Sequence, residues 1–282
     1  NRSDLLQGCL DSLRKTVPAE LMDIIIIDHE SDDVATRELL QKESKSCTIA
    51  TYTGLFNFAA MMNLGARSVP KGKHTHFLLL NNDTVASHPG WLEHLASLAQ
   101  RPDVGAVGAT LLYPDHSIQH SGVIFGLAGP ADHAHKFHTH GTMGLNGSLF
   151  AVRDYSAVTA ACMIVPCSAY EAVNGFDESF AIGFNDTDFC LRLKDKGYKI
   201  LQTPYTVLFH LESQSRLADR THPADTKRFM DRYESFIKSG DPFYSPYLEN
   251  EGFTHLPKLG AACPLNIPSR LVTTPWASSE QL

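Results

Sequence analysis

Short apolar runs alternate with amphipathic stretches through residues 1–107, and this alternation constrains the fold more than any other feature of the chain. Runs of this length predict strands, and apolar residues at helical spacing predict helices. The predicted strands cover residues 22–28, 47–52, 77–80 and 104–107, and the predicted helices cover 4–14, 33–43, 57–67 and 89–100. Strands that alternate with helices imply right-handed crossovers and a mostly parallel sheet. We therefore expect an α/β fold with helices flanking the sheet.

The first predicted element is a helix, over residues 4–14 with Ser3 as its N-cap. A sheet of this kind normally opens with a strand before its first helix. We therefore expect the first strand of the fold to be missing from the chain.

The second half of the chain predicts a smaller mixed region. Strands are expected within residues 109–125 and over 157–165, 198–202 and 206–210, and helices over 168–173, 185–196 and 223–238. Residues 126–150 are rich in Gly and His and predict a long loop. The proline-rich segment from residue 241 predicts a tail that wraps the surface or moves.

Charge and cysteine content narrow the class of protein. The net charge of −7 argues against a nucleic-acid binder that depends on phosphate contacts. Six cysteines without a Cys-x-x-Cys pair favour reduced thiols over a disulfide framework or a zinc site. The longest apolar runs are too short to cross a bilayer. We expect a cytoplasmic protein, and leave open a peripheral contact with the inner face of a membrane.

Four polar clusters lie at the ends of predicted elements. They are Asp28-His-Glu-Ser31, Asn81-Asn-Asp83, Asn185-Asp-Thr-Asp188 and His210-Leu-Glu-Ser213. Ligands of open α/β sheets bind just outside the carboxyl ends of the strands. Each cluster also has a structural interpretation, because Asp and Asn cap helices and a lone His is commonly a satisfied core residue. Four such clusters on one sheet favour a ligand site.

The histidine-rich segment Asp132-His-Ala-His-Lys-Phe-His-Thr-His140 has three interpretations. The favoured one is a solvated polar loop, because no Cys and no helical His pairing accompany it. The second is a metal site. The third is a loop over the acceptor side of a cleft, which the glycine-rich residues 141–147 would allow to move.

An ordered set of motifs covers roughly residues 1–250. It comprises Asp4-Leu-Leu-Gln-Gly-Cys-Leu-Asp-Ser-Leu13, Ile27-Asp-His-Glu-Ser-Asp-Asp33, Phe56-Asn-Phe-Ala-Ala-Met-Met-Asn-Leu-Gly65, Leu79-Leu-Asn-Asn-Asp-Thr84, Ile118-Gln-His-Ser-Gly-Val123, Val158-Thr-Ala-Ala-Cys-Met163, Gly175-Phe-Asp-Glu178, Asn185-Asp-Thr-Asp-Phe-Cys-Leu-Arg192 and His210-Leu-Glu-Ser-Gln-Ser-Arg216. In this order the motifs resemble family 2 glycosyltransferases of the GT-A fold, and among them bacterial surface-polysaccharide enzymes of the rhamnosyltransferase-like type.

The resemblance implies a role for each matching residue. It implies a metal site at Asp83 and His210 and a catalytic base at Asp186. The donor-binding residues that it implies are Asp28, His29, Ser31, Asn57, Asn63, Asn81, Asn82 and Arg216. The acceptor-side residues are Phe184, Asp188 and Glu212. It also implies a nucleotide-sugar-binding half over residues 1–110, an acceptor-binding and catalytic half over 111–240, and a tail over 241–282.

The chemistry of these residue types agrees with an inverting glycosyltransferase. Mn²⁺ or Mg²⁺ would neutralise charge on the departing nucleoside diphosphate, and one carboxylate would take the proton of the acceptor hydroxyl. The implied partners are a nucleotide-diphosphate sugar and a saccharide or lipid-linked saccharide acceptor. His29, Asn81 and Asn185 depart from the family pattern and keep open a non-catalytic nucleotide- or sugar-binding module. A nucleotidyltransferase is a further alternative, although a glycine-rich basic phosphate loop is not seen.

Overall fold

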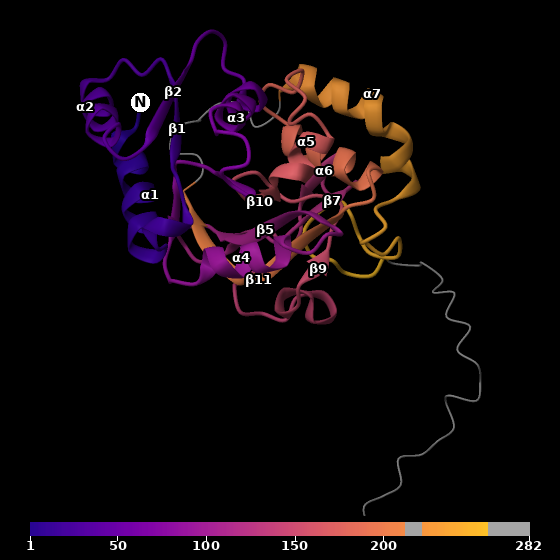
Figure 1. Ribbon diagram of the computed structural model, residues 1–282. Helices are drawn as coiled ribbons and strands as arrows, with labels where there is room; N and C mark the ends of the chain where they lie inside the picture. The colour runs from indigo at the N-terminus through magenta and orange to yellow at the C-terminus, as the bar shows by residue number, and fades with distance from the viewer. Residues whose placement is uncertain (212–221, 259–282) are drawn as a thin grey trace, which may run out of the picture.

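The apolar runs of the sequence form a central sheet in the computed structural model, which describes residues 1–211 and 222–258 (Figure 1). The order of its main strands is β3 (His76–Leu80), β10 (Cys162–Pro166), β5 (Val104–Leu112), β11 (Lys199–His210) and β4 (Thr84–Ala86). Two short strands extend this sheet: β6 (Ile118–His120) pairs with β5, and β9 (Arg153–Asp154) pairs with β11. Every residue of β5 is buried, so this strand lies at the centre of the core.

The expected α/β class is confirmed, but the centre of the sheet is mixed. β5 and β11 are parallel, whereas β10 runs antiparallel to both β3 and β5, and β4 runs antiparallel to β11. β10, from the second half of the chain, lies between two strands of the first half. The two halves of the chain therefore share one sheet.

A second sheet holds β1 (Ile25–His29) and β2 (Thr48–Tyr52), which pair in parallel. Among the described residues no strand lies between β1 and β3. β1 and β3 are mostly half-buried. For β3, the apolar run at 77–80 had predicted a strand buried on both faces. The expectation of a further strand before residue 1 stays a prediction.

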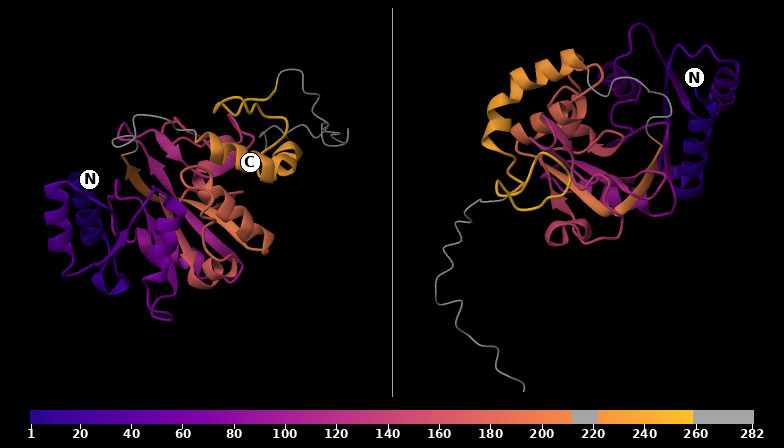
Figure 2. Two further views of the ribbon diagram at one scale, coloured as in Figure 1. Left: turned by 90° about the horizontal axis from the view of Figure 1, so that it is seen from above. Right: turned by 180° about the vertical axis from the view of Figure 1, so that it is seen from behind.

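Helices cover both faces of the central sheet. On one face, α1 (Ser3–Thr16) and α4 (Trp91–Ala99) pack with Val107, Ala109 and Leu111 of β5. On the other face, α5 (Cys167–Ala172), α6 (Asn185–Asp195) and α7 (Pro223–Ser239) form a core with the neighbouring Ala106. Figures 1 and 2 show α1 and α7 on opposite sides of the molecule. Successive side chains of β5 point to opposite faces of the sheet, and they therefore contribute to two hydrophobic cores.

The remaining helices belong to the first half of the chain. Asp33 caps α2 (Val34–Glu43), and Asn57 caps α3 (Phe58–Arg67), each by accepting a backbone N–H bond. The N-cap of α1 is Arg2, without a side-chain cap bond, so the prediction of Ser3 as its N-cap is wrong. A short 3₁₀ turn, η1 (Ala19–Leu21), follows α1.

The segment predicted as a long loop contains regular structure. β7 (Val123–Phe125) pairs with β8 (Ala131–His133), and η2 (Leu145–Phe150) follows. The two strands predicted within 198–210 are one strand, β11, with an irregular register between Thr203 and Val207. The described part of the tail packs on the body, where the Asp241 carboxylate accepts the backbone N–H of Phe125 at 2.9 Å.

Two expectations concern the whole chain. The five cysteines that lie in the described ranges are free thiols. Within those same ranges, none of the helices is both long and apolar enough to cross a membrane.

Candidate active site

The four polar clusters of the sequence meet at one cavity of about 1750 Å³. It extends along β1 and β3 and reaches the first turn of α6 and the end of β11. Asp28, Asp83, Asp186 and His210 all line it, although 182 residues of sequence separate the first from the last. The sheet topology brings these ends together, as the sequence pattern predicted.

Asp83 and His210 are neighbours because their strands are neighbours. β4 pairs with β11 so that Thr84 lies opposite His210, and the backbone N–H of Leu211 donates to the carbonyl of Asp83 at 2.9 Å. The His210 Nε2 atom lies 3.1 Å from Asp83 Oδ1, and the two side chains are 9% and 12% exposed. The structure thus confirms the predicted proximity of this pair.

Gln119 of β6 sets the orientation of the His210 ring. His210 Nδ1 donates to Gln119 Oε1 at 2.6 Å, and the Asn81 amide approaches Nε2 at 3.1 Å. Nε2 is therefore the ring nitrogen that lies beside the carboxylate of Asp83. A nitrogen lone pair and a carboxylate oxygen at this separation suit a shared divalent cation, because both are metal ligands.

Asp186 lies in the first turn of α6, on the side that faces the cavity. Its two carboxylate oxygens accept the backbone N–H groups of Ala160 at 3.2 Å and Thr187 at 2.8 Å. Burial raises the pKa of Asp186, and these hydrogen bonds oppose the rise. A raised pKa makes the carboxylate a stronger base.

Phe184 introduces the helix that carries Asp186. Its backbone adopts a left-handed conformation with φ of 60°, which is strained for a bulky residue. Its ring stacks on Phe229 of α7 at 4.4 Å and also lines the cavity. This packing holds the sharp turn that presents Asp186.

Five of the eight residues predicted to bind the donor line the same cavity. Asp28, His29, Ser31, Asn81 and Asn82 all line the cavity. His29 Nε2 is bonded to the Gly54 carbonyl at 2.8 Å, and its ring lies against those of Tyr52 and Phe56. An aromatic shelf of this kind at the end of β1 suits the face of a planar base.

Two predicted donor residues make hydrogen bonds that stabilise the fold. The Asn57 side chain caps α3 and donates to the carbonyl of Glu178. Asn63 is buried and makes four hydrogen bonds, two of them with Phe176. Neither side chain is among those that line the cavity, and a role of Asn57 and Asn63 in donor binding stays a prediction.

Asp188, which was predicted as an acceptor-side residue, is not among the residues that line the cavity. Its carboxylate is fully buried on the opposite side of α6. It accepts from Arg192 at 2.8 Å, Arg232 at 2.6 Å and the Tyr233 hydroxyl at 2.7 Å. Asp188 therefore joins α6 to α7. Two other predicted site residues, Glu212 and Arg216, lie outside the described residues.

Gln119 and His133 line the cavity, and the sequence assigned no site role to Gln119 or to His120, which contacts His133. Gln119 orients His210, and His120 Nδ1 lies 2.6 Å from His133 Nδ1. Burial lowers the pKa of His133 to about 4, so this histidine is neutral near pH 7. Gln119 and His120 lie in the motif at 118–123, and this was the one signal that pointed to them. The position of His133, at the edge of the cavity, agrees with the acceptor-side interpretation of the histidine-rich loop.

The sequence comparisons agree with this geometry. The family model for glycosyltransferase-like family 2 matches residues 2–227. The chain is 34% identical over 251 residues to the O-antigen biosynthesis protein RfbC of Myxococcus xanthus, a match that covers 88% of this chain and 20% of RfbC. It is also 34% identical over 260 residues to the uncharacterized protein y4gI of Sinorhizobium fredii, a match that covers 86% and 28% of the two chains. The chain thus spans less than a third of the length of either curated relative.

Solved structures share the fold at low sequence identity. GalNAc-T7, solved with UDP, GalNAc and Mn²⁺, has a TM-score of 0.62 and 12% identity, over 83% of this chain and 47% of its own. The mannosyltransferase PcManGT from Pyrobaculum calidifontis, solved with GDP-Man and Mn²⁺, has a TM-score of 0.55 and 13% identity, over 84% and 67%. Motifs, fold and family match agree that this chain belongs to glycosyltransferase family 2 and has the GT-A fold.

Proposed function

We propose that this chain is an inverting, metal-dependent glycosyltransferase that moves a sugar from a nucleotide-diphosphate donor to an acceptor hydroxyl. The observation that carries the proposal is the distance of 3.1 Å between Asp83 Oδ1 and His210 Nε2, in the same cavity as Asp186. This pairing supplies two ligands for a cation, and Asp186 supplies a base.

Asp83 and His210 would hold Mn²⁺ or Mg²⁺, with Gln119 keeping Nε2 directed at the site. The bound ion would neutralise the negative charge that develops on the leaving diphosphate. Asp28, His29 and Asn82, which line the same cavity, would contact the donor. One carboxylate and one imidazole from the protein would leave several positions of such an ion for water and phosphate oxygens.

Asp186 would act on the acceptor. It takes the proton of the acceptor hydroxyl as that oxygen bonds to the anomeric carbon, while the bond from this carbon to the diphosphate oxygen breaks. One base and an in-line displacement invert the anomeric configuration and need no carboxylate nucleophile. The hydrogen bonds from the Ala160 and Thr187 backbone fix the carboxylate for this transfer.

For the finer assignment we propose hexosyl transfer in bacterial surface-polysaccharide synthesis. The resemblance of the motifs and the name of one relative, an O-antigen biosynthesis protein, support this role. The acceptor would then be a saccharide or a lipid-linked saccharide. We also propose a cytoplasmic location, with contact at the inner face of the membrane where the acceptor is lipid-linked.

The transfer itself can be tested with a panel of nucleotide sugars and simple saccharide acceptors. Proton NMR of the product would report the anomeric configuration, which is opposite to that of the donor if the enzyme inverts. A product with retained configuration would contradict the single-base mechanism. The Asp186→Asn variant, which cannot accept the proton, serves as the matched control.

A further inference from the structure

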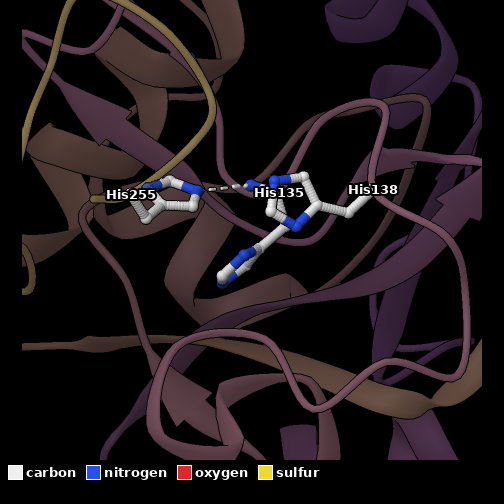
Figure 3. A group of neighbouring side chains, drawn as sticks. All are labelled: His135, His138 and His255. Atoms are coloured by element: carbon white, nitrogen blue, oxygen red, sulfur yellow. Dashed lines mark hydrogen bonds between the residues drawn. The ribbon is translucent and has the colours of Figure 1, made fainter.

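A second group of histidines lies away from the proposed active site. His135 and His138 follow β8, and His255 belongs to the segment after α7. One ring nitrogen from each lies within 4.8 Å of those from the other two (Figure 3). His135 and His255 are almost completely buried, at 3% and 5% exposure. The sequence favoured a solvated loop here, and the burial of His135 contradicts that interpretation.

One ring nitrogen of each histidine is held by a group outside the cluster. The pairs are His135 Nε2 with Ser148 Oγ at 2.9 Å, His138 Nε2 with the Phe253 carbonyl at 2.6 Å, and His255 Nδ1 with the Tyr244 hydroxyl at 3.0 Å. A histidine that binds a metal through one nitrogen almost always has its other nitrogen in such a bond, which fixes the tautomer and the ring.

The opposite nitrogens are the ones left for a ligand. His135 Nδ1 is buried and has no hydrogen-bond partner among the described residues, a costly state for a polar atom. His255 Nε2 accepts the backbone N–H of His135 at 3.1 Å, drawn as a dashed line in Figure 3, and a metal ion would replace this bond. An adjoining cavity of about 360 Å³ is lined by all three histidines and has room for a water ligand.

The backbone at the cluster is strained at two positions. His135 and His255 both have left-handed conformations, with φ of 55° and 54°. Each such residue costs of order 1 kcal/mol or more and tends to be kept at ligand sites. Two strained residues from separate segments therefore converge on one point.

We propose that His135, His138 and His255 bind a transition-metal ion of the Zn²⁺ class, with water as the fourth ligand. Three neutral imidazoles favour Zn²⁺, Co²⁺ or Ni²⁺ over the Mn²⁺ and Mg²⁺ that suit carboxylate sites. The ion would tie the histidine-rich loop to the segment 241–258. Because His133 lines the active-site cavity two residues before His135, the ion would also fix one edge of that cavity.

Isothermal titration with Zn²⁺ tests this site directly. The full chain is titrated in an Asp83→Asn background, which removes the carboxylate ligand of the proposed active-site metal. We expect one equivalent to bind, and His138→Gln and His255→Gln each to weaken its binding by on the order of 100-fold or more. His140→Gln is the matched control, because His140 is an exposed histidine of the same loop and should leave the binding unchanged.

A second readout uses Co²⁺, whose four-coordinate complexes with nitrogen ligands absorb strongly in the visible. The band should appear with the parent protein and the His140→Gln variant and be absent from both cluster variants, with far-UV circular dichroism showing that all are folded. The two cluster variants lie on separate segments, so a folding defect of one leaves the other as a test. Equal Zn²⁺ affinity in a folded cluster variant and its parent would overturn the site, as would parent protein that binds no Zn²⁺. Neither result depends on glycosyl transfer.

Discussion

Asp186 and Asp188 stand two residues apart on α6 and have opposite surroundings. Side chains two positions apart on a helix point to nearly opposite sides. Asp186 therefore lines the cavity, whereas Asp188 is buried against Arg192 and Arg232. The sequence motif contains both carboxylates; the surroundings of the first agree with the proposed base, and those of the second give it structural contacts.

We expect Asp186→Asn to lower kcat by about 10²–10⁴-fold, because the amide cannot accept the acceptor's proton. Nucleoside-diphosphate affinity should stay within a few-fold of wild type. Steady-state kinetics and calorimetry measure the two quantities separately. A variant with wild-type turnover would move the base to another residue.

The pH dependence of kcat/KM should report the same carboxylate. Since burial raises the pKa of Asp186, its base form is lost at a higher pH than for an ordinary aspartate. Activity should therefore fall as the pH is lowered through this raised pKa, and the acid limb of the profile should lie above the usual aspartate range near 3.9. A limb at or below that range would contradict the assignment.

Gln119 is a positioning residue for the proposed metal site, because it accepts from His210 Nδ1 at 2.6 Å. Gln119→Met should weaken Mn²⁺ binding by about 10–100-fold, as losses of such supporting bonds typically do. Gln119→Glu keeps an acceptor at the same place and should restore the binding. Equal Mn²⁺ affinity for wild type and Gln119→Met in calorimetry would show that the ring is held by other contacts.

Site residues could be predicted from the sequence where a polar residue of a suitable type lies at the end of a strand or helix. They were harder to predict where the role of a residue depends on contacts between distant parts of the chain. Asp83, Asp186 and His210 were found because each terminates or opens an element. The structural hydrogen bonds of Asn57 and Asn63 could not be predicted, because an amide that caps a helix or bridges two loops looks in sequence like one that binds a ligand. Gln119 received no role because its contact with His210 spans 91 residues.

At the scale of elements, the joint between α6 and α7 depends on the buried carboxylate of Asp188. Asp188→Ala would leave Arg232 and Tyr233 without their shared acceptor, and loss of one partner of a buried ion pair costs about 3–5 kcal/mol. Urea unfolding should show this loss. Asp231→Ala, which breaks an exposed pair with Lys227, should cost less than about 1 kcal/mol and is the matched control. Similar losses for the two variants would contradict the structural role.

Helices were predictable to within a few residues because their apolar spacing is local. α6 was expected at 185–196 and occupies Asn185–Asp195. β4 was missed because it has only three residues and depends on its pairing with β11. The antiparallel pairing of β10 was also missed, because the sequence of a buried apolar strand does not indicate the direction of the strands beside it.

At the scale of the whole molecule, the central sheet creates the site by joining both halves of the chain. The cluster Asn81-Asn-Asp83 follows β3 in the first half of the chain, and β11 from the second half brings His210 to it by pairing with β4. The polar ends could be predicted to share one edge because the strands of an open α/β sheet place their ligands there. The cavity beside β1 and β3 could not, because it depends on how two separate sheets stand together.

The central claim is a nucleotide-diphosphate site that depends on a divalent cation at Asp83. The most direct test is calorimetric titration of the full chain with UDP, GDP, ADP, CDP and dTDP, with and without Mn²⁺, for wild type and Asp83→Asn. We predict that at least one nucleotide binds wild type, that omission of Mn²⁺ weakens it at least about tenfold, and that Asp83→Asn abolishes this dependence. Binding that is equal with and without Mn²⁺ in wild type, or absent for every nucleotide, would contradict the account.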